Sequence, residues 1–211
     1  MQKNGLIKKL IDNKIYAVVR ANSSQSAIDI AKALIDGGVK TIEISSTCPE
    51  THKAIDVIGQ IDDVIVAAGS IITTEQSDYA IKSGADIIVS PMFENSVARL
   101  CKSYRVPYIA TASTPTEAYN AWKYGVSMIK MFPIHVLGGT DFIENVKKSM
   151  PFLPLMATGG VTIDDFTSYL DAGVSAVGMG KCFYENDESF AQITQKAKLA
   201  TTKLEEYLSS I

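Results

Sequence analysis

Apolar residues follow two different spacings along the chain. Short runs rich in valine and isoleucine recur, and each is followed by a longer segment in which apolar residues return every three or four positions. The short runs are typical of buried strands and the longer segments of amphipathic helices, so their alternation predicts parallel strands with helices packed outside them. Eight strands are expected, at Lys14–Arg20, Thr41–Ser45, Val64–Ala68, Asp86–Ser90, Pro107–Thr111, Ser127–Phe132, Leu155–Thr158 and Ala176–Gly178. Helices are expected to begin near Ser24, Pro49, Thr74, Glu94, Thr116, Thr140, Thr162 and Glu188.

Glycines stand where a predicted helix ends and the next strand begins, as in Asp36-Gly37-Gly38-Val39, Lys82-Ser83-Gly84-Ala85 and Asp171-Ala172-Gly173-Val174. Glycine is common there because it adopts the left-handed backbone conformation that ends many helices. This repeated unit favours a closed (β/α)8 barrel, the TIM barrel, over the alternative of an open doubly wound sheet. The segment Met1–Lys14 predicts a short amphipathic helix that closes one end of the core. In such a barrel the chemistry belongs at the C-terminal ends of the strands.

Composition narrows the class of protein. The chain has 211 residues, 46% hydrophobic and 20% charged, which is ordinary for a compact protein, and we expect a single domain over residues 1–211. Its formal net charge is −3 and its lysines and arginines are scattered, so nucleic acid is not an expected partner. The N-terminal segment lacks the uninterrupted apolar run of a signal peptide or membrane span, so no membrane association is expected.

Cysteines and histidines give no sign of a metal site or a disulfide framework. The three cysteines are odd in number and far apart, which suits reduced thiols in a cytoplasmic protein. His52 falls on a predicted surface helix, and His135 falls in a predicted loop, where it is interpreted as a solvated side chain. Because two isolated histidines do not make a metal site, we expect neither a metal nor a cofactor.

Two charged residues interrupt strands that should be buried. Alternation along Ser127–Phe132 turns Lys130 into the barrel together with Met128 and Phe132. Removal from water disfavours the charged ammonium, and a neutral amine is a nucleophile toward carbonyl carbons. Glu43 lies inside the second predicted strand, where it can move protons as a general acid and base. The alternative is that the two residues only neutralise each other, or that the lysine reaches from the strand end to solvent.

Further polar residues and glycines stand at predicted strand ends. Arg20 ends the first strand and can hold a carboxylate through its planar guanidinium, or it can pair with an acid in a loop. Ser70 and Thr111 occupy equivalent places after other strands. The turns Thr158–Gly160 and Gly178–Lys181 follow the last two strands, where barrels often bind phosphate through backbone N–H groups. Paired glycines also form plain turns, so each turn alone is a weak signal.

Taken together, these motifs resemble the 2-keto-3-deoxy-6-phosphogluconate (KDPG) and 4-hydroxy-2-oxoglutarate (KHG) aldolase family. The resemblance extends from about Ile15 to Tyr184. It is carried by Ile42-Glu43-Ile44-Ser45, Ala67-Ala68-Gly69-Ser70, Val89-Ser90-Pro91, Thr114-Pro115-Thr116-Glu117, Ile129-Lys130-Met131-Phe132-Pro133 and Thr158-Gly159-Gly160-Val161.

The resemblance implies a (β/α)8 barrel and metal-independent cleavage of a keto acid. Lys130 would attack the keto carbon and form an iminium, Glu43 would shuttle protons through a water, and pyruvate would leave after hydrolysis. The family also implies a homotrimer. The other residues that the resemblance places around the substrate are Arg20, Ser70, Thr111, Phe132, Thr158, Gly159, Gly160 and Gly180.

Several positions depart from the family pattern. Ala67–Ser70 replaces the usual Gly-Ala-Gly-Thr, and Ala110-Thr111 replaces a frequent Pro-Gly. Ser45-Ser46-Thr47 lacks an arginine that some members carry, His135 replaces an acid, and Lys181 replaces a serine. These changes leave the aldehyde half of the substrate open, with the galactonate analogue and 4-hydroxy-2-oxoglutarate as candidates beside KDPG. Two other hypotheses are a phosphosugar isomerase or synthase that needs no imine, and an anion-binding barrel without turnover.

Overall fold

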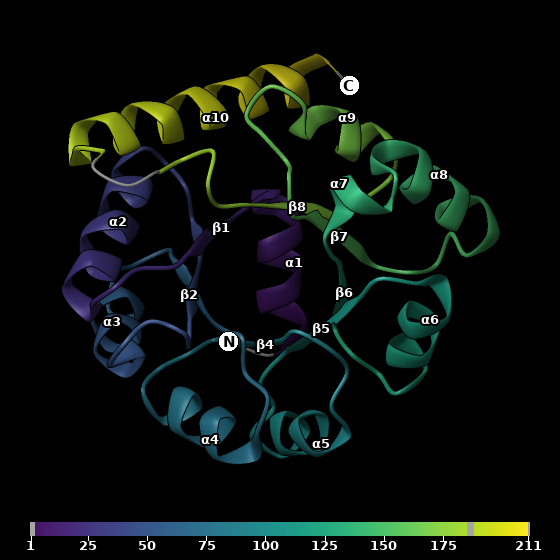
Figure 1. The fold of residues 1–211 in the computed structure, drawn as a ribbon, viewed down its shortest axis with the longest axis horizontal. Helices are drawn as coiled ribbons and strands as arrows, with labels where there is room; N and C mark the ends of the chain where they lie inside the picture. Colours follow the sequence, from purple (N-terminus) through teal and green to yellow (C-terminus); the bar gives the residue numbers. More distant parts are fainter. Residues whose placement is uncertain (1–2, 185–187, 211) are drawn as a thin grey trace.

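The fold is a closed barrel of eight parallel strands, each followed along the chain by helical structure (Figure 1). The structure is a computed structural model that describes residues 3–184 and 188–210. Neighbouring strands pair in sequence order and β8 returns to β1, which confirms the predicted TIM barrel and excludes the open sheet. The strands are β1 Ile15–Val19, β2 Thr41–Ser45, β3 Ile65–Gly69, β4 Ile87–Ser90, β5 Tyr108–Ala112, β6 Met128–Met131, β7 Leu155–Thr158 and β8 Ala176–Met179.

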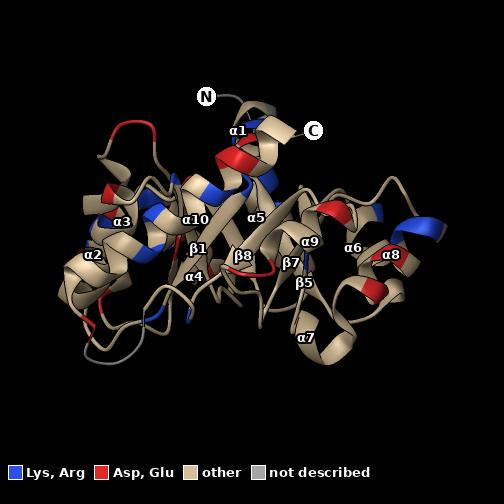
Figure 2. Ribbon diagram, turned by 90° about the horizontal axis from the view of Figure 1, so that it is seen from above, with Lys and Arg blue, Asp and Glu red and all other residues tan. Residues whose placement is uncertain are grey.

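Helices surround the barrel, except for α1, which crosses one end of it (Figures 1 and 2). The helices are α1 Lys3–Asn13, α2 Ser24–Asp36, α3 Thr51–Gly59, α4 Thr74–Lys82, α5 Asn95–Tyr104, α6 Pro115–Lys123, α7 Ile134–Leu137, α8 Gly139–Ser149, α9 Phe166–Asp171 and α10 Phe190–Ser210. Across the described part of the chain, none of these helices has the length and apolar character needed to cross a membrane.

Two helical segments differ from the sequence prediction. The four-residue α7 was not expected, because a single turn between Pro133 and Gly138 is too short to show a helical period. Helix α9 begins at Phe166 instead of near Thr162. Before it, the Asp165 carboxylate accepts the Thr162 N–H at 2.7 Å and Thr162 Oγ1 accepts the Asp165 N–H at 3.3 Å, so these two residues close a turn ahead of the helix.

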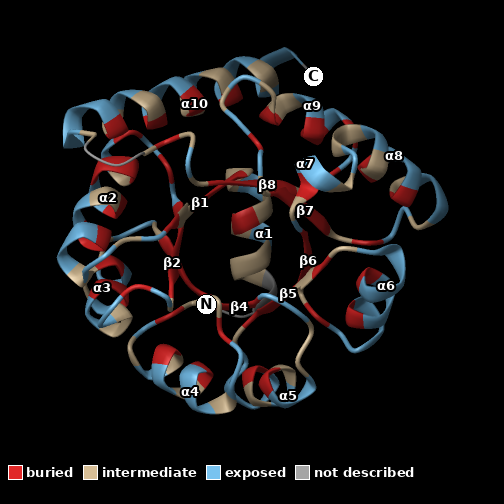
Figure 3. Ribbon diagram, in the orientation of Figure 1, coloured by how far each residue is buried: buried red, intermediate tan, exposed pale blue. Residues whose placement is uncertain are grey.

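The buried apolar residues form two clusters, one inside the barrel and one between the strands and the outer helices. Figure 3 shows the buried residues on the strands and on parts of the surrounding helices. Alternation along each strand divides its residues between the two clusters: Met128 belongs to the inner cluster, Ile129 and Met131 to the outer one. Leu10 of α1 is buried in the inner cluster, with Ile7 beside it. Helix α1 therefore closes the N-terminal end of the barrel, as the sequence predicts.

Asp63 joins α1 to the rim of the barrel, because its carboxylate accepts from Lys9 at 2.9 Å and from Lys40 at 2.7 Å. Hydrogen bonds from Lys40 and then Lys9 lower the pKa of Asp63 from its ordinary 3.8 to about 2. A carboxyl group whose pKa is lower in the folded chain stabilises the fold above its ordinary pKa, and this contribution is lost as the pH falls through the folded value.

We therefore expect Asp63→Asn to lower the melting temperature near pH 7 by a small amount, because the pair is exposed and screened by water. The difference from the wild type should shrink as the pH falls from 3.8 to about 2 and should also shrink in high salt. Differential scanning calorimetry across this range measures it. A melting-temperature difference that stays constant between pH 7 and about 2 would contradict the prediction.

Candidate active site

A pocket of about 720 Å³ opens at the C-terminal ends of the strands. Helix α7 lies at this end of the barrel and α1 at the opposite end (Figure 2). The structure brings all ten candidate residues together around this pocket: Arg20, Glu43, Ser70, Thr111, Lys130, Phe132, Thr158, Gly159, Gly160 and Gly180. Lining residues that the sequence did not mark include Val18, Cys182 and Tyr184.

Lys130 and Glu43 meet at the base of the pocket. The Lys130 Nζ donates to Glu43 Oε2 at 2.8 Å. Strands β6 and β2 stand four apart in a ring of eight and therefore face each other across the barrel, which lets their inward side chains meet. The exposed fraction is 8% for Lys130 and 1% for Glu43. The inward orientation predicted from strand alternation is confirmed.

A buried ion pair of this kind gives little net stability, because removing both charges from water offsets most of their attraction. Within the described residues, Lys130 is the one side chain that donates a hydrogen bond to Glu43. The pair therefore places an amine and a carboxyl group at one pocket, close enough to exchange a proton. Such an arrangement suits covalent chemistry on a carbonyl compound.

Gly69, at the end of β3, makes room for the Glu43 carboxyl group. A Cβ atom at this position would lie 2.1 Å from Glu43 Oε1 and 2.5 Å from its Cδ. No side chain can occupy that space while Glu43 stays in place. The sequence analysis quoted Gly69 as part of a motif but did not identify this role, because the contact joins two strands and leaves no local signal.

Gly69→Ala is accordingly expected to push the Glu43 carboxyl group away from Lys130. The forced shift in a packed core should lower the free energy of unfolding by about 1–3 kcal/mol, as measured by urea denaturation. The matched control is Gly59→Ala in α3, where an added Cβ would meet its nearest atoms at an ordinary 3.4 Å. Equal stability of the two variants, with the ion pair intact in a structure of Gly69→Ala, would contradict the prediction.

Hydroxyl groups of Ser70 and Thr111 are already engaged by the protein. The Ser70 Oγ lies 3.0 Å from Ser45 Oγ, which is also 2.8 Å from Thr47 Oγ1. Thr111 Oγ1 donates to the Ser90 carbonyl at 2.7 Å. Because a hydroxyl has one hydrogen to donate, Thr111 can offer a ligand only an acceptor.

The turn after β7 packs against α7. Gly159 and Gly160 have φ values of +87° and +94°, in the left-handed region that favours glycine. A Cβ at Gly159 would lie 2.7 Å from the Phe132 ring, and a Cβ at Gly160 would lie 2.5 Å from His135. The two glycines therefore bring bare backbone to the pocket wall, as anion binding requires.

His135 has the exposed side chain that the sequence interpretation expects, but it lies in a helix and not in a loop. It lies in α7, and although its side chain is exposed, its Nδ1 is 2.8 Å from the Gly159 carbonyl. The His135 backbone N–H also donates to that carbonyl at 3.1 Å. These contacts involve the Thr-Gly-Gly turn, which folds back onto α7, and they make His135 part of the pocket wall.

Tyr184 fixes the strand end that carries Arg20. The Tyr184 hydroxyl donates to the Val18 carbonyl at 3.0 Å and accepts the Arg20 backbone N–H at 2.7 Å. Burial raises the pKa of Tyr184, so its hydroxyl remains protonated and keeps donating. No motif marked this tyrosine, because its partners lie at the other end of the chain.

Among residues 3–184 and 188–210, no group of three or more His, Cys, Asp or Glu side chains is arranged to hold a metal ion. The closed barrel, the pocket at the C-terminal strand ends and the lysine–glutamate pair define a barrel enzyme that acts on small molecules. Comparison with known proteins makes the class more specific.

A sequence profile described as KDPG and KHG aldolase matches residues 6–196, so the chain belongs to this family of aldolases. It is 31% identical over 158 residues, 74% of this chain and 75% of the relative, to the 2-dehydro-3-deoxy-phosphogluconate aldolase of Treponema pallidum (strain Nichols). It is 28% identical over 186 residues, 87% of this chain and 90% of the relative, to the 2-dehydro-3-deoxy-6-phosphogalactonate aldolase of Escherichia coli (strain K12).

A solved structure agrees with this membership. It is described as a native KDPGal structure and superposes with a TM-score of 0.85 and 26% identity, covering 92% of this chain and 96% of that chain. Aldolases are carbon–carbon lyases, and lyase activity is what the family supports. Membership favours the aldolase hypothesis over the phosphosugar isomerase or synthase.

Proposed function

We propose that the protein is a class I aldolase that forms a Schiff base through Lys130. It would cleave a 2-keto-3-deoxy acid, with 2-keto-3-deoxy-6-phosphogluconate as the first candidate, to pyruvate and glyceraldehyde 3-phosphate without a metal. The observation that carries the proposal is the 2.8 Å contact between Lys130 Nζ and Glu43 Oε2 at the base of the pocket. An amine that hands its proton to a neighbouring carboxylate becomes the nucleophile that this reaction needs.

The proposed reaction begins when the lone pair of Lys130 Nζ attacks the keto carbon, C2, to form a carbinolamine. Protonation of the C2 hydroxyl group, with Glu43 as the proton source, releases water and leaves an iminium. The Glu43 carboxylate, which has just given up its proton, takes the proton of the C4 hydroxyl; the C3–C4 bond breaks, and its electrons flow into the iminium to give an enamine and a free aldehyde. Protonation at C3 and hydrolysis release pyruvate and restore the amine.

The ends of the pocket suit the two anionic groups of such a substrate. We assign Arg20 to the carboxylate, with Ser70, Thr111 and Phe132 beside the carbon chain. The turn at Thr158–Gly160, together with Gly180, would receive the phosphate through backbone N–H groups.

Lys181 lines the same pocket and adds a positive charge near the phosphate end. The relatives named above act, by their names, on phosphogluconate and phosphogalactonate derivatives. The galactonate analogue and 4-hydroxy-2-oxoglutarate are therefore the next substrates to test.

The test is reductive trapping. The protein is incubated with pyruvate and borohydride, digested, and the peptide that contains Lys130 is weighed by mass spectrometry. The proposal expects a permanent adduct on Lys130, together with pyruvate release from at least one of the three keto acids. Pyruvate binding without an adduct or turnover would indicate the non-catalytic barrel, and turnover of a phosphosugar without an adduct would indicate the isomerase or synthase.

We further propose, from the family pattern, that the enzyme works as a homotrimer in the cytoplasm and needs no cofactor. Light scattering of the purified protein tests the trimer directly. A mass of one or two chains would reject it.

A further inference from the structure

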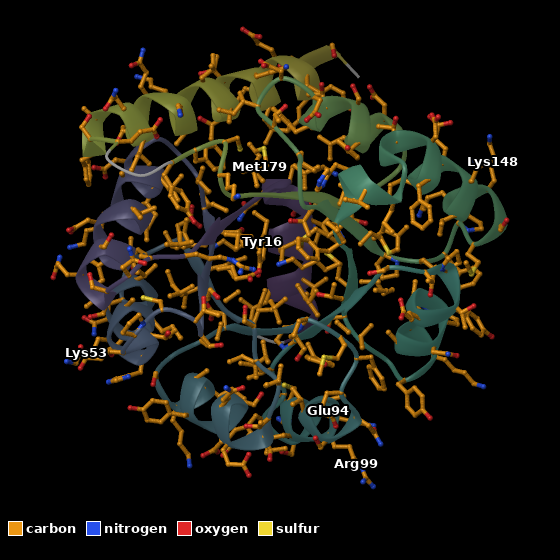
Figure 4. All side chains as sticks on the ribbon, in the orientation of Figure 1. Tyr16, Lys53, Glu94, Arg99, Lys148 and Met179 are labelled. Atoms are coloured by element: carbon orange, nitrogen blue, oxygen red, sulfur yellow. The ribbon has the colours of Figure 1, made fainter. Side chains whose placement is uncertain are left out.

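Tyr16 is a buried residue that the proposed reaction does not use. It lies on β1 in the inner cluster, at the centre of the barrel, and its exposed fraction is 0% (Figure 4). It precedes Val18, which lines the pocket, by one inward-facing position, so it lies one layer below the pocket. Its hydroxyl group has no hydrogen-bond partner among the described residues. Buried tyrosine hydroxyls usually have one, so this absence calls for an explanation.

The side chain of Tyr16 adjoins both members of the ion pair. Lys130 Nζ lies 5.8 Å from the centre of the Tyr16 ring, within the range of a cation–π contact. Burial raises the pKa of Tyr16 well above its ordinary value, and the nearby Glu43 carboxylate raises it further. The hydroxyl is close enough to Glu43 for a hydrogen-bonding interaction to contribute to this rise in pKa, but its position in the free enzyme does not meet the geometry of a hydrogen bond. It therefore keeps its proton and has it available to donate.

The need for that donor arises when Lys130 becomes covalently occupied. In the free enzyme the Glu43 carboxylate accepts from the Lys130 ammonium. An iminium nitrogen carries a single hydrogen, fixed in the plane of the C=N bond, so it cannot serve Glu43 as freely as an ammonium does. Glu43 is then left in a site with 1% exposure, where an unpaired carboxylate is costly.

Among residues 3–184 and 188–210, few other groups face Glu43. The titratable side chains near it in this part of the chain are Lys130 from β6, Tyr16 from β1 and Tyr184 beyond β8. The Tyr184 hydroxyl already donates to the Val18 carbonyl at 3.0 Å. Arg20 lies next to Tyr184 at the pocket mouth. The Tyr16 hydroxyl is thus the donor held in reserve beside this carboxylate.

We propose that Tyr16 is a positioning residue that donates a hydrogen bond to Glu43 while Lys130 is bound to the keto acid as an imine. A hydrogen bond from the Tyr16 hydroxyl, on the side of Glu43 away from the pocket, would keep the Glu43 carboxylate ionised. It would also keep the carboxylate directed at the substrate carbon that gains and loses a proton. No bond other than this hydrogen bond is made or broken by Tyr16. The inference rests on the proposed Schiff-base function.

The experiment compares Tyr16→Phe with a matched control, Tyr108→Phe. Both residues are buried tyrosines, with exposed fractions of 0% and 2%. The Tyr108 hydroxyl donates to the Met92 carbonyl at 3.2 Å and accepts the Glu94 N–H at 3.0 Å, and Tyr108 itself is not part of the pocket lining. Three quantities are measured for each variant: the melting temperature, the amount of borohydride-trapped pyruvate, and the rate at which pyruvate methyl protons exchange with D2O.

Methyl exchange reports the proton transfer between iminium and enamine, and it does not require the aldehyde half to be known. For Tyr16→Phe we expect the maximal exchange rate to fall about tenfold, because one hydrogen bond to a charged group is lost. The half-saturating pyruvate concentration should change less than about twofold, and the trapped adduct should persist. The acidic limb of the exchange rate should move to higher pH, because a carboxylate without its donor takes up a proton more readily.

The two variants should differ in melting temperature. Tyr16→Phe should melt at the wild-type temperature or above it, because its hydroxyl has no partner in the free enzyme. Tyr108→Phe should melt at a lower temperature and exchange pyruvate protons at the wild-type rate. A wild-type exchange rate and pH profile in Tyr16→Phe would overturn the proposal, as would a lower melting temperature that alone accounts for a slower rate.

The same measurements distinguish a failure of the proposed Schiff-base function from a failure of the proposed role of Tyr16. If the wild type forms no borohydride adduct with pyruvate, both the Schiff-base function and the role of Tyr16 are rejected. If the wild type forms the adduct and Tyr16→Phe behaves like the wild type, only the role of Tyr16 is rejected.

Discussion

Lys130→Met is expected to abolish the covalent pyruvate adduct and to slow pyruvate release by at least about 10⁴-fold, the scale on which enzymes lose rate with their nucleophile. Methionine keeps the length and most of the apolar volume of lysine, so the barrel interior stays filled. Borohydride trapping followed by mass spectrometry measures the adduct, and a coupled assay of pyruvate measures the rate.

The matched control is Lys181→Met, which removes another lysine from the wall of the same pocket. It should retain the adduct on Lys130. An adduct on Lys181, or full trapping in Lys130→Met, would refute the assignment.

Stability gives a second test of the same substitution. Lys130→Met leaves the Glu43 carboxylate buried without its partner, which should lower the free energy of unfolding by about 3–5 kcal/mol at neutral pH. Adding Glu43→Gln to the same chain removes the buried charge and should restore most of that loss. Urea denaturation of the two single variants and the double variant measures the coupling.

Glu43→Gln alone is expected to slow the exchange of pyruvate methyl protons by about 10²–10⁴-fold, which is the usual contribution of a general acid or base. The amide keeps an oxygen that accepts from Lys130 but loses the group that carries the proton. Borohydride trapping should become slower without being abolished, because the attacking nitrogen is still present. NMR in D2O measures the exchange.

A control for this variant is Glu117→Gln, whose carboxylate accepts the Ser113 N–H at 2.9 Å ahead of α6 and lies outside the pocket lining. It should exchange pyruvate protons at the wild-type rate. An unchanged exchange rate in Glu43→Gln would reject the proton-transfer role of this carboxyl group.

Strand and helix positions were predictable because their signal is local. Val and Ile in short runs mark the strands, and the glycines after α2, α4, α6 and α9 (Gly38, Gly84, Gly125 and Gly173) mark where those helices end. The inward direction of Lys130 follows from its immediate neighbours, since Ile129 and Met131 can face only the outer layer. Its meeting with Glu43 follows from placing the second and sixth strands on a closed ring.

The remaining features of the site depend on contacts that a linear pattern does not record. Gly69 is required by the space that Glu43 occupies on the neighbouring strand, and a glycine at a strand end otherwise looks like a turn. Tyr16 looks like any large residue of a barrel core, and only the lack of a partner for its hydroxyl sets it apart. His135 was misplaced because α7 is one turn long.

Helix α1 has a kinetic consequence. In the described part of the chain, α1 and the inner apolar cluster close the N-terminal end of the barrel, and the pocket opens at the C-terminal ends of the strands. In the proposed reaction the keto half of the substrate stays covalently bound to Lys130 at the base of the pocket, while the aldehyde half is released closer to the pocket opening. Departure is then ordered, aldehyde first and pyruvate second, and in the synthetic direction pyruvate must enter before its partner.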